Sequence, residues 1–221
     1  MRRVWPLALA LLALPLSGRA DDGVPSSGRL SDDDFYRMAT CGAPVGGDCQ
    51  RDPMFWVKPR LTIALRRPQP GFPKALLPQL DDALNAAIAQ INTAGAGVTL
   101  TRNDHRWSAD ILIIPAALHE GDETRRIPRM TDGQQIGVGF MQVWQTDRNR
   151  ATEGSILIAA DISREDLPSV MLEELFQSLG FLFDLDNSWY DGRSILAQDS
   201  NVTTTIDGQD RMALRRHYPP E

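Results

Sequence analysis

Three polar side chains on one predicted helix have types and spacing that could do chemistry. Glu173, Glu174 and Gln177 fall in a mainly apolar stretch, residues 171–180. Carboxylates can act as a general acid or base, and carboxylate and amide oxygens can bind cations. Adjacent residues on an α-helix lie about 100° apart, so the two Glu cannot face the same point. We therefore expect one of them to enter a groove and the other to be solvated or paired with an Arg.

The segment that follows this helix adds further polar candidates. If the protein is a hydrolase that uses carboxylates, Glu174 and Asp186 could supply the acid and the base, with Glu173 and Asp184 close by in the sequence. A purely structural role is the alternative, in which Glu174 or Gln177 hydrogen-bonds loop backbone and fixes residues 184–200. No catalytic residue is assigned. The residues expected to line a cleft or binding site are Glu173, Glu174, Gln177, Ser188 and Ser194.

The spacing on this helix resembles that of the zincin peptidases. Their H-E-x-x-H motif places two His on one helix face to bind zinc, and its Glu activates water. In this sequence Glu173 and Gln177 stand at the two His positions and Glu174 at the general-base position. Gly180 matches the turn glycine of the metzincins, whereas Phe183 occupies the position of their third ligand. The resemblance implies a zincin-like scaffold that lacks its His ligands.

No cofactor is expected from this ligand set. Zinc is not expected, because it favours Cys and His ligands. The three His are scattered and make no H-x-x-x-H pair, and each is expected to be a surface or capping residue: His105, His119 and His217. Calcium stays open as an alternative. The acidic run from Asp184 to Asp191 loosely resembles an EF-hand loop, but Trp189 stands where that loop requires Gly.

The same region also resembles an uncharacterised family of exported proteobacterial proteins, domain of unknown function 2927. The shared features are the residues 173–180, Asp186-Asn187-Ser188, Ser194-Ile195, the closing segment 207–218 and the paired Cys41 and Cys49. The resemblance extends over Thr40 to Pro219, and its specific part is the last fifty residues or so. Phe176 and Leu196 depart from the pattern, which would have Thr and an aromatic residue there. The family implies no established activity.

The first twenty residues are typical of a Sec-type signal peptide. Two Arg follow Met1, an apolar run extends from Val4 to Leu16, and small residues at Gly18 and Ala20 suit cleavage after Ala20. The apolar run is short for a membrane span, although an N-terminal anchor is the alternative. We therefore expect a protein of the periplasm, or a secreted one.

Composition narrows the classes of partner. The chain has 221 residues, 42% of them hydrophobic and 24% charged, which is typical of a globular protein. Removal of residues 1–20 takes away three Arg and no acid and moves the net charge from -6 to -9. Nucleic-acid binding is not expected, because no basic excess or stripe is present. Membrane binding after cleavage is not expected either, because an acidic protein is repelled by anionic lipid.

Cys41 and Cys49 are the two cysteines of the sequence, and we expect them to form a disulfide. An exported protein meets an oxidising compartment, and the turn-rich segment between them can bring its ends together. Two Cys without neighbouring His do not make a zinc site.

The predicted fold is α+β, a single zincin-like domain over residues 40–221, after a signal peptide (1–20) and a flexible leader (21–39). Period-two and continuous apolar patterns predict a mixed sheet of about five strands, at residues 61–65, 98–101, 109–114, 136–144 and 155–160. Two long amphipathic helices, starting near Leu76 and Ser163, are expected on one face of the sheet, and a last helix at 207–216. Ser155 to Ala160 is the candidate edge strand.

Three functions are compatible with these features. The first is a non-catalytic, zincin-like protein that binds an extended peptide or an envelope protein in its degenerate cleft. The second is a hydrolase that uses carboxylates or an atypical metal. The third is a structural envelope protein in which the helix motif is a packing remnant.

Overall fold

The computed structural model describes residues 14–17, 23–105 and 108–220, with backbone pairing alone for 14–17. The expected signal peptide, residues 1–20, lies outside the described residues except for that short segment. The strands of the main sheet are β1 (Leu14–Ser17), β3 (Phe55–Trp56), β4 (Arg60–Leu65), β5 (Thr99–Arg102), β6 (Ile111–Pro115), β7 (Gly139–Gln145) and β8 (Arg150–Ile158).

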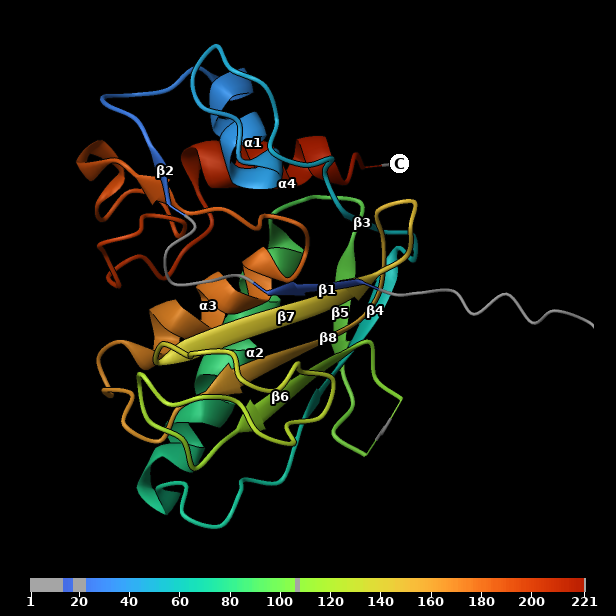
Figure 1. Ribbon diagram of the computed structural model, residues 1–221, viewed down its shortest axis with the longest axis vertical. Helices are drawn as coiled ribbons and strands as arrows, with labels where there is room; N and C mark the ends of the chain where they lie inside the picture. The colour runs from blue at the N-terminus through green and yellow to red at the C-terminus, as the bar shows by residue number, and fades with distance from the viewer. Residues whose placement is uncertain (1–13, 18–22, 106–107, 221) are drawn as a thin grey trace, which may run out of the picture.

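These strands form a seven-stranded mixed sheet in the order β1-β7-β8-β6-β4-β5, with β3 paired to the start of β8 (Figure 1). Strands β3, β4, β5, β6 and β8 are parallel, whereas β7 runs antiparallel to β8 and β1 antiparallel to β7. A separate pair of short parallel strands joins β2 (Val24–Pro25) to β9 (Leu185–Asp186). The expected α+β domain is thus confirmed, with more strands than the five that the apolar patterns indicate.

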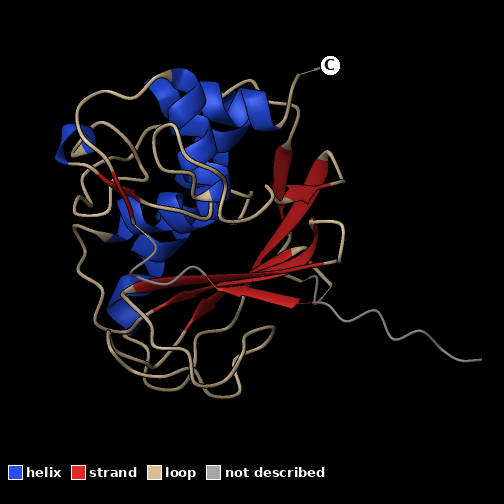
Figure 2. Cartoon of the chain, turned by 45° about the horizontal axis from the view of Figure 1, so that its top comes forward, coloured by secondary structure: helices blue, strands red, loops and turns tan. Residues whose placement is uncertain are grey.

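Four α-helices lie within the described residues: α1 (Asp32–Cys41), α2 (Leu77–Thr93), α3 (Leu167–Gln177) and α4 (Gly208–His217). Short 3-10 turns occur at η1 (Lys74–Leu76) and η2 (Ser188–Tyr190). Figure 2 shows the helices gathered on one side of the sheet. Helices α2 and α3 pack against each other there, and their apolar faces share one core with the sheet. This arrangement buries both predicted amphipathic stripes.

Helix α3 begins later than its sequence pattern indicates. Ser163 does act as a cap, since its Oγ accepts a hydrogen bond from the Asp166 backbone N–H at 2.9 Å. That cap closes a separate turn, and the helix itself starts at Leu167 with Pro168 in its first turn. Proline suits this position because its missing N–H would have no intrahelical partner there.

The opposite face of the sheet is covered by the loop between β6 and β7. Ile127, Met130 and Ile136 from this loop pack on Leu112 and Phe140 in a second, smaller core. Alternate residues of β7 therefore face different layers. Those that point away from this loop are directed towards α3.

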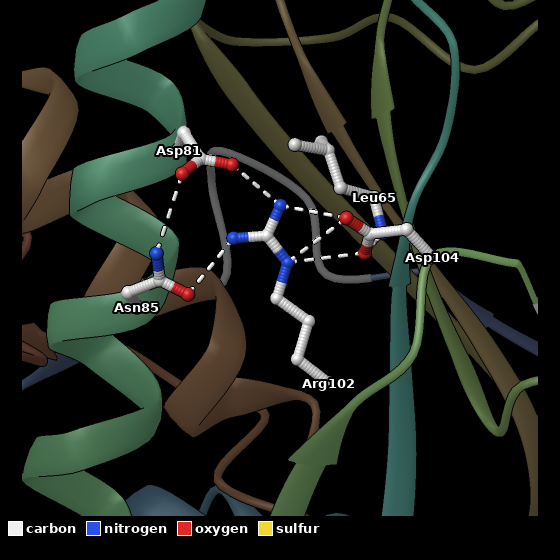
Figure 3. A network of polar contacts seen from close by, with 5 residues as sticks. All are labelled: Leu65, Asp81, Asn85, Arg102 and Asp104. Atoms are coloured by element: carbon white, nitrogen blue, oxygen red, sulfur yellow. Dashed lines mark hydrogen bonds and ion pairs between the residues drawn. The ribbon is translucent and has the colours of Figure 1, made fainter.

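A charged network fixes the other end of the sheet to α2 (Figure 3). The guanidinium of Arg102, at the end of β5, binds Asp104 at 2.7 Å and Asp81 of α2 at 2.5 Å, and it donates to Asn85 Oδ1 at 2.8 Å. Asp104 also accepts the Leu65 backbone N–H at 2.9 Å. The hydrogen bonds from Arg102 lower the pKa of Asp104.

Two predictions about the organisation of the chain are wrong. The leader expected over 21–39 is folded where it is described: it contributes β2 and most of α1, whose Phe35 and Met38 are fully buried. The expected edge strand, Ser155 to Ala160, lies within and just after β8, which is paired on both sides by β7 and β6. Strand β7, which contacts α3, lies one strand nearer to the edge of the sheet than β8 and is followed there by β1.

The predicted disulfide between Cys41 and Cys49 is confirmed, with an S–S distance of 1.99 Å. It links the C-terminus of α1 to the following turn. No helix among the described residues combines the length and apolarity needed to cross a bilayer.

Candidate functional site

A polar cavity of about 170 Å³ opens between α3 and the start of β7. Helix α3 contributes Val170, Glu173, Glu174 and Gln177, and the strand side contributes residues 137–141. The remaining walls come from the segment just after α3 and from more distant loops: Leu182, Asp184, Glu120, Gln198 and Asn201. The cavity therefore depends on the tertiary fold rather than on one motif.

Glu173 and Glu174 both line this cavity. The expectation that one would enter a groove while the other is solvated or paired with an Arg is wrong. The cavity wraps around one side of α3, because β7 forms one wall and the loop residues Asp184, Gln198 and Asn201 form another. Two residues about 100° apart on a helix can both reach a space of that width.

Glu174 is the most unusual group of the site. Its side chain is buried, with 9% of its surface exposed, and its Oε2 has no hydrogen-bond partner among the described residues. Burial, followed by the nearby Asp184, raises the pKa of Glu174 to about 8. Burial, followed by Asp184 and Glu174, also raises the pKa of Glu173 well above its usual value. Both shifts reflect the cost of placing negative charge in a confined space.

Gln177 and Asp184 are directly connected. The Gln177 Nε2 donates to Asp184 Oδ1 at 2.6 Å. The structural alternative expected Glu174 or Gln177 to bind loop backbone, but this bond joins two side chains. The hydrogen bond between Gln177 and Asp184 still connects α3 to the segment that begins at Asp184, as the structural alternative requires.

Gly139 at the start of β7 lets the strand approach α3 closely. A Cβ at this position would lie 2.5 Å from Glu174 Oε1 and 2.6 Å from Val170 Cγ1. Neither distance is tolerated by a real Cβ, so a larger residue would displace the Glu174 carboxylate or the helix. Gly139 thus shapes the wall of the cavity by having no side chain.

Three other sequence candidates lie outside the residues that line this cavity. Asp186, in β9, and Ser188, in η2, are exposed. Ser194 is buried, and its Oγ donates to Asp210 Oδ1 at 2.6 Å. Asp210 also accepts the Ile195 backbone N–H at 3.0 Å, so this pair fixes the loop to α4. The structure therefore does not bring Ser188, Ser194 or Asp186 together with Glu174.

Phe183 and His217 belong to the core. Phe183 is buried, and its ring fills the space next to Gly42. His217 was expected at the surface or as a cap, and this is wrong: its Nε2 lies 2.8 Å from the Met54 carbonyl oxygen and its ring stacks on Phe55. Burial lowers the pKa of His217 to about 4, which keeps the imidazole neutral. His105 and His119 are exposed, as expected.

Sequence reasoning missed several walls of the cavity, namely Glu120, Gly139, Gln198 and Asn201. Gly139 gave a weak signal, as a glycine inside a strand pattern often marks a close approach of backbone. The others lie in loops, whose path the sequence pattern does not specify. No Lys, Arg or His is found among the described residues that line the cavity.

Across the described part of the chain, no group of three or more His, Cys, Asp or Glu side chains is arranged to hold a metal ion. The cavity residues that could contact a cation are carboxylates and amides, and they do not form a ready-made coordination shell.

Comparison with known proteins agrees with the expected family. The chain belongs to the family described as "Protein of unknown function (DUF2927)", whose model matches residues 78–221. This region runs from α2 to the C-terminus and contains every wall of the cavity, whereas α1 and the disulfide precede it. A search of curated proteins finds no match.

Proposed function

We propose that this protein is exported and binds an extended peptide or protein segment, without cleaving it, in the cleft between β7 and α3. The observation that carries the proposal is the composition of the cavity on α3. Residues Glu173 and Gln177, at the positions of the zinc-binding His of a zincin, line that cavity together with Glu174. Such a cavity beside a strand can accept one side chain of a bound polypeptide, and it lacks the imidazoles that zinc chemistry requires.

The order of the elements supports a zincin-like scaffold. Along the chain β4, α2, β5, β6, β7 and β8 lead into α3. In the sheet β7 is the antiparallel strand next to β8, and it contacts α3 directly. This places a strand beside the helix that carries the polar motif, which is the arrangement that the sequence resemblance implies.

The outer side of β7 can accept another strand. In the structure β1 pairs with it antiparallel, from Leu14 opposite Gln145 to Ser17 opposite Gln142. Within the described residues, that pairing stops short of Gly139–Met141, which line the cavity. A strand added at an edge gains main-chain hydrogen bonds, and neighbouring pockets then select its side chains.

Removal of the signal peptide on export would free the outer side of β7 for another strand. Strand β1 falls inside the signal peptide that we expect to be removed after Ala20, so cleavage would take away the strand that covers β7. The exported protein would then present the whole of Gly139–Gln145 as an edge beside the cavity. We propose that an incoming peptide adopts the direction and register of β1, which pairs antiparallel with β7.

The test uses the protein purified after export from its full-length gene, with its N-terminus and metal content determined by mass spectrometry. We expect an N-terminus at Asp21, no stoichiometric zinc and no hydrolysis in a broad peptide screen, together with saturable binding of extended peptides. N-methylation of alternate peptide amides removes main-chain hydrogen bonds and should abolish this binding. Stoichiometric metal with turnover would overturn the proposal, and so would binding that is insensitive to N-methylation.

A hydrolase is the second candidate, favoured by the raised pKa of Glu174. A carboxyl group that is protonated near pH 7 can act as a general acid. The pair expected from the sequence, Glu174 and Asp186, is not brought together, so Glu173 or Asp184 would have to be the partner. Turnover in the peptide screen that is lost in Glu174→Gln would favour this candidate. A structural envelope role would be favoured if no peptide or envelope protein binds.

A further inference from the structure

The cavity on α3 is lined by acidic side chains on several sides. Glu173 and Glu174 come from the helix, Asp184 from the segment after it, and Glu120 from the loop that precedes β7. Among the described wall residues there is no basic side chain to balance them. Carboxylates gathered in this way repel one another unless they are protonated or meet a cation.

One of these carboxylates is aimed into the cavity without a partner. Glu174 Oε2 is inaccessible to solvent and accepts no hydrogen bond from the described residues. Gln198, which also lines the cavity, has a second buried acceptor without a hydrogen-bond partner among the described residues, its Oε1, which lies beside Gly23. Buried acceptors without donors are costly, so a site that retains them is suited to a ligand that brings donors.

The size of the cavity limits what that ligand can be. Its volume of about 170 Å³ is below the range of about 300–1,000 Å³ that is typical of small-molecule pockets. It suits the end of one side chain. The two acceptors without partners call for a group with several N–H donors, and both ammonium and guanidinium groups carry only donors.

The position of the cavity relative to β7 suggests how such a group arrives. Gly139 has no side chain, and its neighbours Val138 and Phe140 also line the cavity. A peptide paired with the outer side of β7 would point alternate side chains towards α3, because successive side chains in a strand face opposite sides. One of them could enter the cavity past Gly139.

We propose that the cavity formed by Glu173, Glu174, Asp184 and Gln198 binds the basic side chain, Lys or Arg, of an extended segment lying along β7. This inference rests on the proposed peptide-binding function and specifies the chemistry that the site selects. The cation would replace the missing donors of Glu174 and Gln198 and neutralise the carboxylates around it. A metal ion is the less suitable occupant, since the described residues form no three-ligand group.

The experiment measures binding of blocked heptapeptides that alternate Ser and Val around one central position. That position is Arg, Lys, citrulline, norleucine or Glu, and affinities are measured by calorimetry with the exported protein. We expect Arg or Lys peptides to bind at least tenfold more tightly than those with citrulline or norleucine, and the Glu peptide to bind most weakly. Citrulline keeps the shape of Arg without its charge, so it separates charge from size.

Two matched variants complete the test. Glu174→Gln removes a carboxyl group that can ionise beside a bound cation, with little change in volume, and should reduce the preference for Arg and Lys at least tenfold. Glu165→Gln makes the same change at an exposed position that does not line the cavity, and it should leave the preference unchanged. Thermal unfolding of both variants shows whether each is folded.

The outcomes distinguish the two proposals. Equal binding of all five peptides, or a preference for basic residues that survives Glu174→Gln, would overturn the basic-side-chain inference and leave peptide binding intact. No binding of any peptide would overturn the proposed function together with it. Saturable binding of Ca²⁺ without any peptide, measured in the same calorimeter and lost in Glu174→Gln, would also contradict the inference. It would show that the carboxylates bind a metal ion.

Discussion

The carboxylate of Glu174 occupies the space that a side chain at Gly139 would need, with Oε1 only 2.5 Å from the position of that Cβ. Strand β7 and helix α3 are thus fitted to each other at the point where the polar cavity opens. The approach is possible because the strand contributes no side chain there, and it buries a carboxyl group that has incomplete hydrogen bonding. This contact supplies the first prediction.

Gly139→Ala should lower the free energy of unfolding by about 1–3 kcal/mol, the usual cost of inserting a methyl group into a filled space. It should also weaken peptide binding, since the displaced Glu174 would no longer reach the cavity. Denaturant unfolding measures the first effect. In a Glu174→Ala background the cost of Gly139→Ala should shrink, although the contact with Val170 remains. Additive effects of the two substitutions would contradict this contact.

The second prediction concerns the dependence of stability on pH. The pKa of Glu174 is about 8 in the folded protein against 4.5 for the ordinary group, so between these pH values the folded state holds a proton that the unfolded state has lost. Stability should therefore fall as pH rises from about 5 to 8. Asp210 contributes in the same direction, because burial raises its pKa to about 7. Glu173 does so as well, and Asp184 and Glu120 are the other acids that line the cavity with Glu174.

Glu174→Gln should remove part of this slope and stabilise the protein at pH 8 by about 1–4 kcal/mol, because a neutral amide avoids the cost of burying the charge. Urea unfolding at pH 5 and at pH 8 provides the comparison. The same substitution should weaken the binding of basic peptides. A residue whose removal improves stability and harms binding is retained for function. Loss of stability at pH 8 in this variant would argue for the structural alternative.

The third prediction concerns Asp210, which fixes the loop after α3 without lining the cavity. Asp210→Ala leaves the Ser194 hydroxyl and the Ile195 N–H without their acceptor and should cost about 2–4 kcal/mol. Peptide affinity in the folded fraction should stay unchanged. Ser194→Ala removes only one of the two bonds and should cost less. A selective loss of binding in Ser194→Ala, with stability retained, would return Ser194 to the functional site.

The fourth prediction concerns the disulfide between Cys41 and Cys49. It closes a short loop at the end of α1, so its reduction should lower the free energy of unfolding by about 2–3 kcal/mol on the loop-entropy estimate. Thermal unfolding with and without reductant measures this. The Cys41→Ser, Cys49→Ser double variant should show the same loss and no response to reductant. Because both residues lie outside the cavity, peptide specificity should not change.

Much of the sheet and the helices α2, α3 and α4 were predicted from the sequence, because the apolar patterns of these elements are regular. Helix α1 was missed. Its region is polar and rich in acids, yet Ser31 caps it, with its Oγ accepting the Asp34 N–H at 3.1 Å, and Asp32 to Asp34 lie in its first turn. Both features are start signals for a helix and could have identified it.

The site was predicted in part. Glu173, Glu174 and Gln177 were predicted as cleft residues, and all three line the cavity, although the helix spacing led us to expect the two Glu to face different surroundings. Ser188 and Ser194 were wrongly grouped with them, because proximity in sequence does not determine where a loop turns. Gln198 carried no local signal, and its place opposite Glu174 depends on the path of the whole segment after β9.

Amide hydrogen exchange of β7, in the protein that lacks residues 1–20, tests the central claim most directly. The exchange of residues 139–145 is measured with and without a saturating Arg-containing heptapeptide. A peptide that adds as a strand beside α3 should slow exchange in this segment selectively, and the effect should vanish with the N-methylated peptide. Slowing confined to other segments, or unchanged exchange in β7 while the peptide is bound, would contradict binding along this edge.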